Sequence, residues 1–437
     1  MKEILKKLEL NKNDYIFLII ILVFILLFFK PLITSDGVGY YALTEAIFKD
    51  HTLDLANQER LDTANNTNVI EFNPITNKFV SKYPVGLALI QGPLYSLSLV
   101  LDDFSIFHIK DEFFLQERGD ILIHQLAMAL THLILLFIAL IGSIVILKKY
   151  FSKGLDKKKF WLIPLTVAIV FFGSSFLRYA TYDISLTHAV EAGLFTILIL
   201  FLLKKSSNYT SYASGLLIGF LTLIRYTSAL FFLPLTVYFI IKKQYRNLAL
   251  TLTGFIPFVL ITLVYNLVQY GSPFSIGYGF SEGTFAIIPV HLLQILFDPA
   301  RGLLFWTPLL IAGIIGLFYL RHEKKYLFLG FILMYLLFYG GYTWWEGAWG
   351  FGNRFFLVFF PLIVIGLFEL IKRFKYALHV SIILMLYTFL LGLMFTAFVV
   401  EPISLWNNID YWLLQGNILS LPQLLFEKLG IIRFLTG

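Results

Sequence analysis

The chain has 437 residues, of which 58% are hydrophobic and 14% are charged, and its mean hydropathy is +0.80. Soluble domains contain about 45–50% apolar and about 25% charged residues, so this composition excludes an ordinary soluble protein and indicates a polytopic membrane protein. The net charge of +7 does not indicate nucleic-acid binding, because the basic residues stand in short clusters between apolar runs rather than on one solvated face.

Eleven apolar runs predict membrane-spanning helices, since about twenty apolar residues cross a bilayer. The first run, at 15–29, follows a basic start and ends in Lys30-Pro31 without a small-residue cleavage site, so we interpret it as a retained anchor. In chain order we expect spans at 15–33, 121–147, 160–177, 184–203, 212–225, 227–241, 247–270, 302–320, 326–343, 355–371 and 376–400. An odd number of crossings puts the two termini on opposite sides of the membrane. We expect the N-terminus in the cytoplasm and the C-terminus outside.

The basic clusters agree with this orientation, because short loops rich in Lys and Arg stay in the cytoplasm. The segments assigned to the cytoplasm contain the clusters at 2–12, 148–159, 204–205, 242–246, 321–325 and 372–375. The run 84–101 is nearly long enough to be another span, but a crossing there would place the Lys-rich segment 148–159 outside. We therefore expect 84–101, with its internal Gly92-Pro93, to be a helix that lies on or dips into the outer leaflet.

The runs 212–225 and 227–241 are too short for two full crossings, which need about forty residues. They predict short half-helices that meet inside the protein, where such ends line a cavity. Arg225 stands at their junction, and a charge inside the membrane costs about 2.5–3.5 kcal/mol or more. Its candidate partners are Glu191, in a structural ion pair, or an anionic ligand.

These elements predict an all-α polytopic membrane protein. One membrane-embedded domain is expected over 1–400, and its largest water-facing piece is the outer loop 34–120. A short extracytoplasmic tail is expected at 401–437.

The segment Thr34-Ser35-Asp36-Gly37 places a carboxylate directly after the first span. A helix is expected over 38–48, and Ser35 or Asp36 can cap it, since Asp is a preferred N-cap. Alternatively, Asp36 is a general base, because a carboxylate at a boundary between lipid and water can accept the proton of a positioned hydroxyl. The expected helix has one apolar side, formed by Tyr40, Leu43, Ile47 and Phe48.

Several isolated cations are predicted to lie on the same side of the membrane as Asp36. Each of them can simply extend to lipid headgroups, but together they suit a phosphate, which Arg binds in a bidentate manner and Lys as a point charge. His188 is either a phosphate or metal contact or a packing residue. The candidate phosphate ligands are Lys82, Arg225, Arg301, Arg354 and His188, with Arg178 in the same outer group.

The segment 340–354 combines Trp, Tyr and Gly with Glu346 and Asn353. Interfacial Trp and Tyr often form an aromatic belt, but the many glycines indicate a tightly folded loop. Aromatic faces beside a carboxylate and an amide can also hold a sugar. The candidate sugar or acceptor contacts are Tyr40, Tyr41, Tyr83, Trp345, Glu346 and Asn353. A divalent metal is compatible with such a site, but the sequence contains no evident ligand cluster, and the absence of cysteine excludes thiolate ligands.

Four motifs in this order resemble the membrane-embedded GT-C glycosyltransferases, in particular bacterial relatives of protein O-mannosyltransferases and of lipid A aminoarabinose transferases. The motifs are Asp36 after the first span, Lys-Tyr-Pro-Val-Gly at 82–86, Pro-Ala-Arg-Gly-Leu-Leu-Phe-Trp-Thr-Pro at 299–308, and the stretch 344–361, which runs from Trp-Trp-Glu-Gly through Gly-Asn-Arg-Phe-Phe to Pro361. The resemblance implies an inverting transfer from a polyprenyl-phosphate sugar to a hydroxyl of a glycan, lipid or protein. It also implies that Asp36 is the base, that Lys82 contacts the donor phosphate, and that the active site faces outward from a prokaryotic cytoplasmic membrane.

Two departures from the family pattern concern the same motifs. Many members have Asp-Glu after the first span, whereas Gly37 follows Asp36 here, and Tyr83 separates Lys82 from Pro84. A transporter or flippase for a lipid-linked substrate is the main alternative, supported by the short pair around Arg225. An outer-face glycan polymerase or ligase is a third reading.

Overall fold

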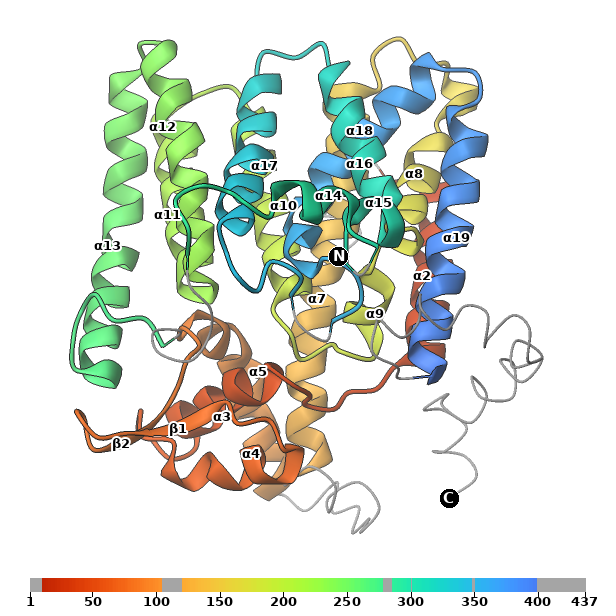
Figure 1. The fold of residues 1–437 in the computed structure, drawn as a ribbon. Coiled ribbons are helices and arrows are strands. Elements are labelled where there is room, and N and C mark those ends of the chain that lie inside the picture. The colour runs from red at the N-terminus through yellow and green to blue at the C-terminus, as the bar shows by residue number, and fades with distance from the viewer. Residues whose placement is uncertain (1–9, 104–119, 278–284, 300, 348–349, 399–437) are drawn as a thin grey trace. The chain divides into compact units, whose positions relative to one another are not determined.

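The computed structural model describes residues 10–103, 120–277, 285–299, 301–347 and 350–398, and these residues are mostly helical (Figure 1). Their contacts divide the chain into two compact units, and the boundary runs through the long helix α7 (Leu122–Ile146). Unit 1 comprises 1–29, 137–181 and 283–437, and unit 2 comprises 30–136 and 182–282. The predicted single domain and the tail stay predictions, and 399–437 lies outside the described residues.

Unit 1 is built of helices. They are α2 (Lys12–Phe28), the end of α7 with η2 (Leu147–Phe151), η3 (Lys157–Lys159), α8 (Leu162–Phe172), α9 (Phe176–Thr181), α14 (Leu292–Phe297), α15 (Leu303–Trp306), α16 (Pro308–Phe318), α17 (Lys325–Gly340), η5 (Arg354–Phe359), α18 (Phe360–Arg373) and α19 (Ala377–Phe398). Helices α16 and α18 approach closely at Gly316 and Gly366, where an added Cβ on Gly316 would lie 1.9 Å from the Gly366 carbonyl oxygen. Small residues at such a seam allow the two backbones to meet.

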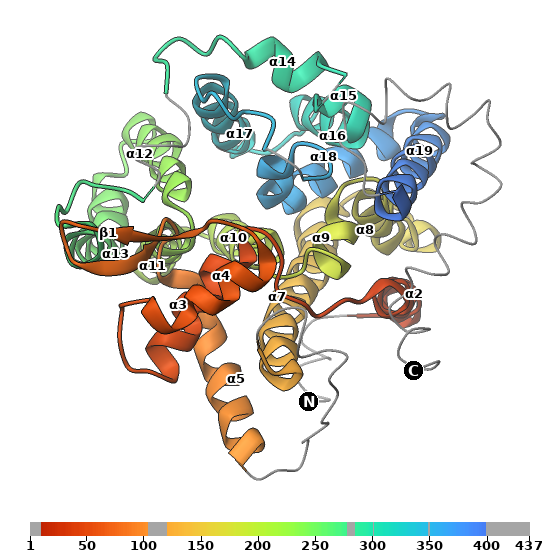
Figure 2. The same cartoon turned by 60° about the horizontal axis from the view of Figure 1, so that its bottom comes forward.

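Unit 2 contains long apolar helices and a second part, 34–103, which we name the outer part because it lies in the predicted outer loop. Its elements are α3 (Gly37–Phe48), η1 (Ala56–Gln58), α4 (Glu59–Asn65), β1 (Ile70–Asn73), β2 (Lys78–Ser81), α5 (Gly86–Asp103), the start of α7, α10 (His188–Leu203), α11 (Asn208–Ile224), η4 (Tyr226–Phe231), α12 (Phe232–Ile241) and α13 (Tyr245–Tyr270). Figure 2 brings α3, α4 and α5 toward the viewer.

Four helical stretches in the described part of the chain are long and apolar enough to cross a membrane. They are Leu122–Phe151, Tyr245–Tyr270, Arg354–Arg373 and Ala377–Phe395. A helix or two consecutive helices occupies each of the eleven predicted ranges. The chain is therefore a mostly helical protein with apolar helices suited to a bilayer, and the count of eleven crossings stays a prediction.

Some helices of unit 1 are too short to cross a bilayer. Helices α8 and α16 have 11 residues each, or about 16 Å at 1.5 Å per residue, whereas the hydrocarbon core is about 30 Å thick. Non-helical backbone at membrane depth is tolerated where it is buried in protein or lines a cavity. The segments that continue these short helices are therefore places where polar groups can collect.

The outer part of unit 2 differs from the all-α expectation in one feature. Strands β1 and β2 form an antiparallel hairpin in which Ile70 faces Ser81 and Asn73 faces Lys78. The side chains of Asn73 and Thr76 donate to the Gln269 carbonyl at 3.1 and 3.0 Å, so the hairpin rests on the end of α13. Helix α5 confirms the predicted helix over 84–101 and contains Pro93.

Helix α3 is more deeply buried than expected. We predicted one apolar side, but all residues from Gly37 to Ala46 are buried. Glu45 is among them, and its carboxylate forms salt bridges with Lys49 and Arg60. The one-sided prediction was wrong because the outer loop folds over the helix, and charge pairing lets even a glutamate enter the interior.

Candidate functional site

The turn before α3 presents Asp36 at the N-cap position, directly before the helix begins at Gly37. Ser35 adopts a left-handed conformation with φ 48°, and the amide of Gly37 donates to the Thr34 carbonyl at 2.8 Å, which reverses the chain. Asp36 is half-buried, and its side chain makes no capping hydrogen bond. The carboxylate therefore does not have the capping role that a preferred N-cap residue suggests.

Ser185 holds this turn in place. The amide of Thr34 donates to Ser185 Oγ at 3.0 Å, and Ser185 Oγ lies 3.3 Å from the Thr34 carbonyl. A Cβ on Gly37 would lie only 2.1 Å from Ser185 Oγ. Close packing therefore requires glycine after Asp36, and a glutamate at this position would clash with Ser185.

Lys82 belongs to the same unit and has a rigidly held backbone. The hydroxyls of Tyr270 and Tyr265 donate to the carbonyls of Ser81 and Tyr83, on either side of Lys82, at 2.7 and 2.9 Å. Lys82 is half-buried, and its Nζ lies 5.3 Å from the centre of the Tyr83 ring. The lysine is therefore presented from a fixed segment.

Tyr40 and Tyr83 connect the segment of Asp36 with the segment of Lys82. Tyr41, in contrast, is packed inside the outer part. The rings of Tyr40 and Tyr83 lie 4.2 Å apart, and Tyr40 is one helical turn after Asp36. Tyr41 is fully buried and donates its hydroxyl to Asp120. Burial, followed by the charge of Asp120, raises the pKa of Tyr41 well above its usual range. Tyr41 thus has a structural contact with Asp120, and its predicted role as a sugar contact stays a prediction.

The break between α11 and η4 places Arg225 beside Glu191. Glu191 was one of the two predicted partners of Arg225, and an anionic ligand was the other. Arg225 has an extended backbone, with φ −151° and ψ 119°, and interrupts the two short helical stretches. Its Nη1 lies 3.3 Å from Glu191 Oε2, to which Thr187 also donates at 3.1 Å. His188 Nδ1 lies 3.8 Å from the same oxygen. Arg225 and His188 therefore face a protein carboxylate.

A second group of predicted residues gathers in unit 1 around three aromatic rings. Trp306, Phe351 and Phe395 form a buried cluster. The guanidinium carbon of Arg178 lies 4.7 Å from the Phe395 ring, and that of Arg301 lies 5.5 Å from the Trp306 ring. Trp306 Nε1 donates to the Pro299 carbonyl at 2.9 Å, which holds the turn that carries Arg301.

The electrostatics of Arg301 show that several cations share this region. Arg301 is only 4% exposed, and its burial lowers the pKa of the guanidinium to about 10. Burial is the main cause of this lower pKa; the charges of Arg354 and Arg178 contribute to it, and Tyr179 and Glu346 oppose it. Like charges that lower one another's pKa are stabilised when an anion joins them. We name Arg178, Arg301 and Arg354 the arginine cluster.

The loop 340–354 folds tightly around the same cluster. A Cβ on Gly350 would lie 2.4 Å from the Tyr179 hydroxyl and 3.1 Å from Arg354 Cδ. Asn353 is fully buried and donates from Nδ2 to the Trp345 carbonyl at 3.0 Å. Trp345 is buried, and its ring stacks 6.2 Å from that of His291. Asn353 and Trp345 therefore shape the loop, and half-buried Glu346 supplies a carboxylate near Arg301.

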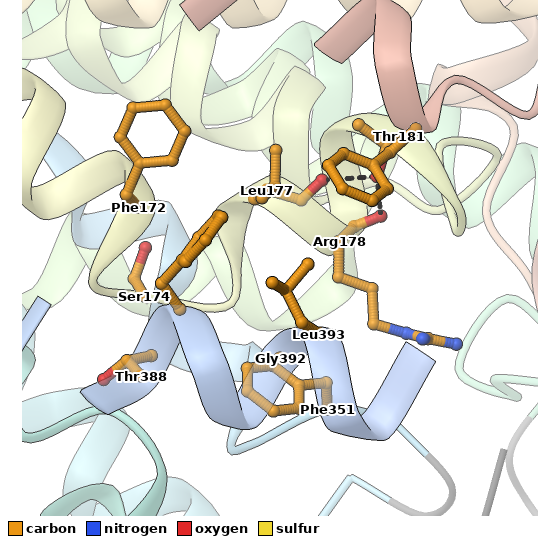
Figure 3. Close-up of a pocket in the computed structure, with 11 residues that line it drawn as sticks. Phe172, Ser174, Leu177, Arg178, Thr181, Phe351, Thr388, Gly392 and Leu393 are labelled. Atoms are coloured by element: carbon orange, nitrogen blue, oxygen red, sulfur yellow. Dashed lines mark hydrogen bonds between the residues drawn. The ribbon is translucent and has the colours of Figure 1, made fainter. Parts of the chain in front are cut away.

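A mostly apolar pocket of unit 1 adjoins the arginine cluster, between α9 and α19 (Figure 3). Its enclosed volume is about 30 Å³, and its mouth is open. Figure 3 shows the Arg178 side chain running along α19 past Gly392 and Leu393. The pocket thus combines an apolar wall with a cation at its edge. Its lining residues are Phe28, Phe172, Ser174, Leu177, Arg178, Thr181, Phe351, Thr388, Phe389, Gly392 and Leu393.

Comparisons with protein-family models, with curated proteins and with solved structures found no match to this chain. The resemblance to GT-C enzymes therefore rests on the four sequence motifs. Among the residues that the structure describes, no group of three or more His, Asp or Glu side chains is placed to hold a metal ion.

Sequence reasoning missed the residues that position the candidates. Ser185 lies in the Ser-Leu-Thr-His segment that drew attention to His188, but one sequence does not distinguish its role from that of its neighbours. Tyr265 and Tyr270 read as ordinary aromatic residues at the end of a membrane helix. Their hydrogen bonds to the backbone around Lys82 join residues that are far apart in the sequence, with separations of 182 and 189 positions.

Proposed function

We propose that this protein is an inverting glycosyltransferase that moves a sugar from a polyprenyl-phosphate donor to a hydroxyl acceptor. The observation that carries the proposal is the Asp36 turn, which is held by Ser185 while its carboxylate is not used as a helix cap. A fixed carboxylate at the start of a buried helix suits a general base, which must lie within hydrogen-bonding reach of a substrate proton.

Lys82 supports the same reaction from within unit 2. Its backbone is fixed by two tyrosine hydroxyls, so its ammonium can serve as a preorganised charge for the donor phosphate. In the proposed reaction Asp36 accepts the proton of the acceptor hydroxyl as that oxygen attacks the anomeric carbon. The bond from this carbon to the phosphate oxygen breaks, and its electron pair stays on the lipid phosphate. Lys82 stabilises the negative charge that develops there.

The arginine cluster supports an anionic, lipid-linked substrate independently. Arg301 is buried beside like charges, and guanidinium groups bind phosphate in a bidentate manner. The adjoining pocket is apolar, with Arg178 at its edge. An apolar chain that ends in a phosphate has the matching chemistry. The glutamate contact of Arg225 favours a structural role for that residue, so we do not include it among the phosphate ligands.

The proposal includes a membrane topology. The chain crosses a prokaryotic cytoplasmic membrane eleven times, the N-terminus is cytoplasmic, and Asp36 and Lys82 face outward. The support is the position of the Lys and Arg clusters in the short loops of one side.

Transfer by purified protein in lipid nanodiscs tests the function. A panel of polyprenyl-phosphate hexoses and pentoses is offered with glycan, lipid and peptide acceptors, and release of polyprenyl phosphate is measured. Asp36→Asn should reduce the rate by about 10²–10⁴-fold, the usual contribution of a general base. Glu71→Gln is the matched control, because Glu71 is an exposed carboxylate of the same outer part.

Two outcomes would contradict the proposal. Equal rates for wild type and folded Asp36→Asn would remove Asp36 from catalysis. If no donor of the panel is turned over by wild type, glycosyl transfer itself is wrong for this substrate class.

A transporter for a lipid-linked substrate is the second candidate, favoured by the paired charges at the helix break of Arg225. Movement of a fluorescent polyprenyl-phosphate sugar across liposomes distinguishes the two functions. A transporter should move the lipid equally well with Asp36→Asn and lose movement with Arg225→Met.

A further inference from the structure

The segment 285–297, which we name the α14 segment, exposes a continuous apolar surface. No Asp, Glu, Lys or Arg occurs between Glu282 and Asp298. Ile287 is fully exposed, at 103%. The side chains that are more than half exposed are Ile287, Ile288, Val290, Leu293 and Phe297. A contiguous patch of this kind on a folded protein marks a contact with a membrane or with another protein.

Several polar groups of the α14 segment are paired within the protein. His291 and Gln294 bond to each other through Nδ1 and Oε1. The amides of Ala286 and His291 donate to the carbonyls of Gly341 and Gly340 at 2.7 and 2.8 Å. Pro289 has no amide hydrogen to satisfy. Backbone and side-chain pairing of this kind is what hydrocarbon requires, because it offers no hydrogen-bond partners.

The patch continues onto the surface of α17. The Phe285 ring lies 4.7 Å from the Phe338 ring and 4.6 Å from the Tyr342 ring. Helix α17 itself exposes Leu333 and Leu337. One apolar surface therefore runs from α17 onto the α14 segment, without a charged side chain between 283 and 297.

We propose that the α14 segment is immersed in the lipid bilayer, where acyl chains cover Ile287, Ile288, Val290, Leu293 and Phe297. Lipid fits better than a protein partner, because a protein interface surrounds its apolar centre with a polar rim, and the two polar side chains here pair with each other. The segment lies between the expected spans 247–270 and 302–320, in a connection that the predicted topology places outside, so this connection is partly an interfacial element rather than wholly water-facing. It leads directly into the turn with Arg301, which immersion keeps beside the membrane.

Nitroxide labelling tests this placement. Because the chain contains no cysteine, each introduced cysteine is a single labelling site, and no native cysteine has to be removed first. Ile287→Cys, Ile288→Cys and Leu293→Cys are labelled in vesicles of phosphatidylethanolamine and phosphatidylglycerol. Collision rates with oxygen, which concentrates in lipid, and with a water-soluble nickel chelate are then compared. Leu386→Cys on α19 is the lipid control, and Glu71→Cys on β1 is the water control. Replacement of exposed side chains leaves the packing intact, and gel filtration of each labelled variant verifies the fold.

We expect high oxygen and low chelate collision rates at all three sites, as at Leu386→Cys. Chelate access similar to that at Glu71→Cys would place the segment in water and overturn the proposal. Low rates with both reagents would mean that protein covers the segment, which also overturns it. Spin–spin broadening would then identify a second copy of the chain as that cover. None of these results depends on enzymatic activity.

Discussion

Replacement of Gly37 with alanine tests the packing that holds Asp36. The new Cβ would lie 2.1 Å from Ser185 Oγ and 2.4 Å from Ser185 Cβ, whereas carbon atoms in good contact are about 3.5–4.0 Å apart. The turn and the segment of Ser185, which precedes α10, must therefore separate by roughly 1 Å or more, and the 3.0 Å hydrogen bond from Thr34 to Ser185 must lengthen.

The expected cost follows from these contacts. Overpacking costs about 1–3 kcal/mol, and one lost hydrogen bond costs about 0.5–1.5 kcal/mol. The gain from replacing glycine by alanine in a helix is about 1 kcal/mol. We expect Gly37→Ala to lower the free energy of unfolding by about 1–3 kcal/mol and to reduce sugar transfer, because Asp36 is the adjacent residue.

Unfolding by titration with SDS in mixed micelles measures the stability. Ser185→Gly removes both clashing side-chain atoms, so the double variant Gly37→Ala/Ser185→Gly should be more stable than the sum of the single changes predicts, by about 1 kcal/mol or more. Gly392→Ala in α19 is the matched control, since its Cβ would meet Phe351 at an ordinary 3.5 Å. Wild-type stability of Gly37→Ala, with additive effects in the double variant, would refute the reasoning.

Two further predictions concern charged groups of unit 2. Glu191→Gln removes the carboxylate that Arg225 contacts inside the protein, so we expect about 3–5 kcal/mol lower stability in the same SDS titration. Glu191→Gln/Arg225→Met should recover most of it, and an equally unstable double variant would contradict the ion pair. Burial raises the pKa of Asp50, but hydrogen bonds from Gln58 and Asn57, together with the charges of Lys49 and Arg60, lower it below its usual value. The ionised form therefore favours the fold, so the stability lost in Asp50→Asn should be constant between pH 5 and pH 7 and should shrink as the pH falls below about 3.9. A loss that grows on acidification would contradict this sign.

The apolar pattern predicted most helices correctly, because it reflects local hydrophobicity and length. The helix over 84–101 and the break at Arg225 were both expected and both observed. The sequence left two possible partners for Arg225, Glu191 and an anionic ligand. A charge inside the membrane needs a partner, but the sequence alone does not say which one it has. The β hairpin was missed, because strands of four residues leave a weak signal among long apolar runs.

The sequence by itself determined that this is a helical protein suited to a membrane, where its apolar segments lie, and which few charged residues need an explanation. Those properties depend on composition and on neighbours along the chain. Only the tertiary structure decided that Asp36 does not cap its helix, that Gly37 makes room for Ser185, and that Tyr265 and Tyr270 fix the backbone of Lys82. These contacts join residues roughly 150 to 190 positions apart. A hydrogen bond or a close approach between such distant residues depends on how the helices pack, and hydrophobic periodicity carries no record of it.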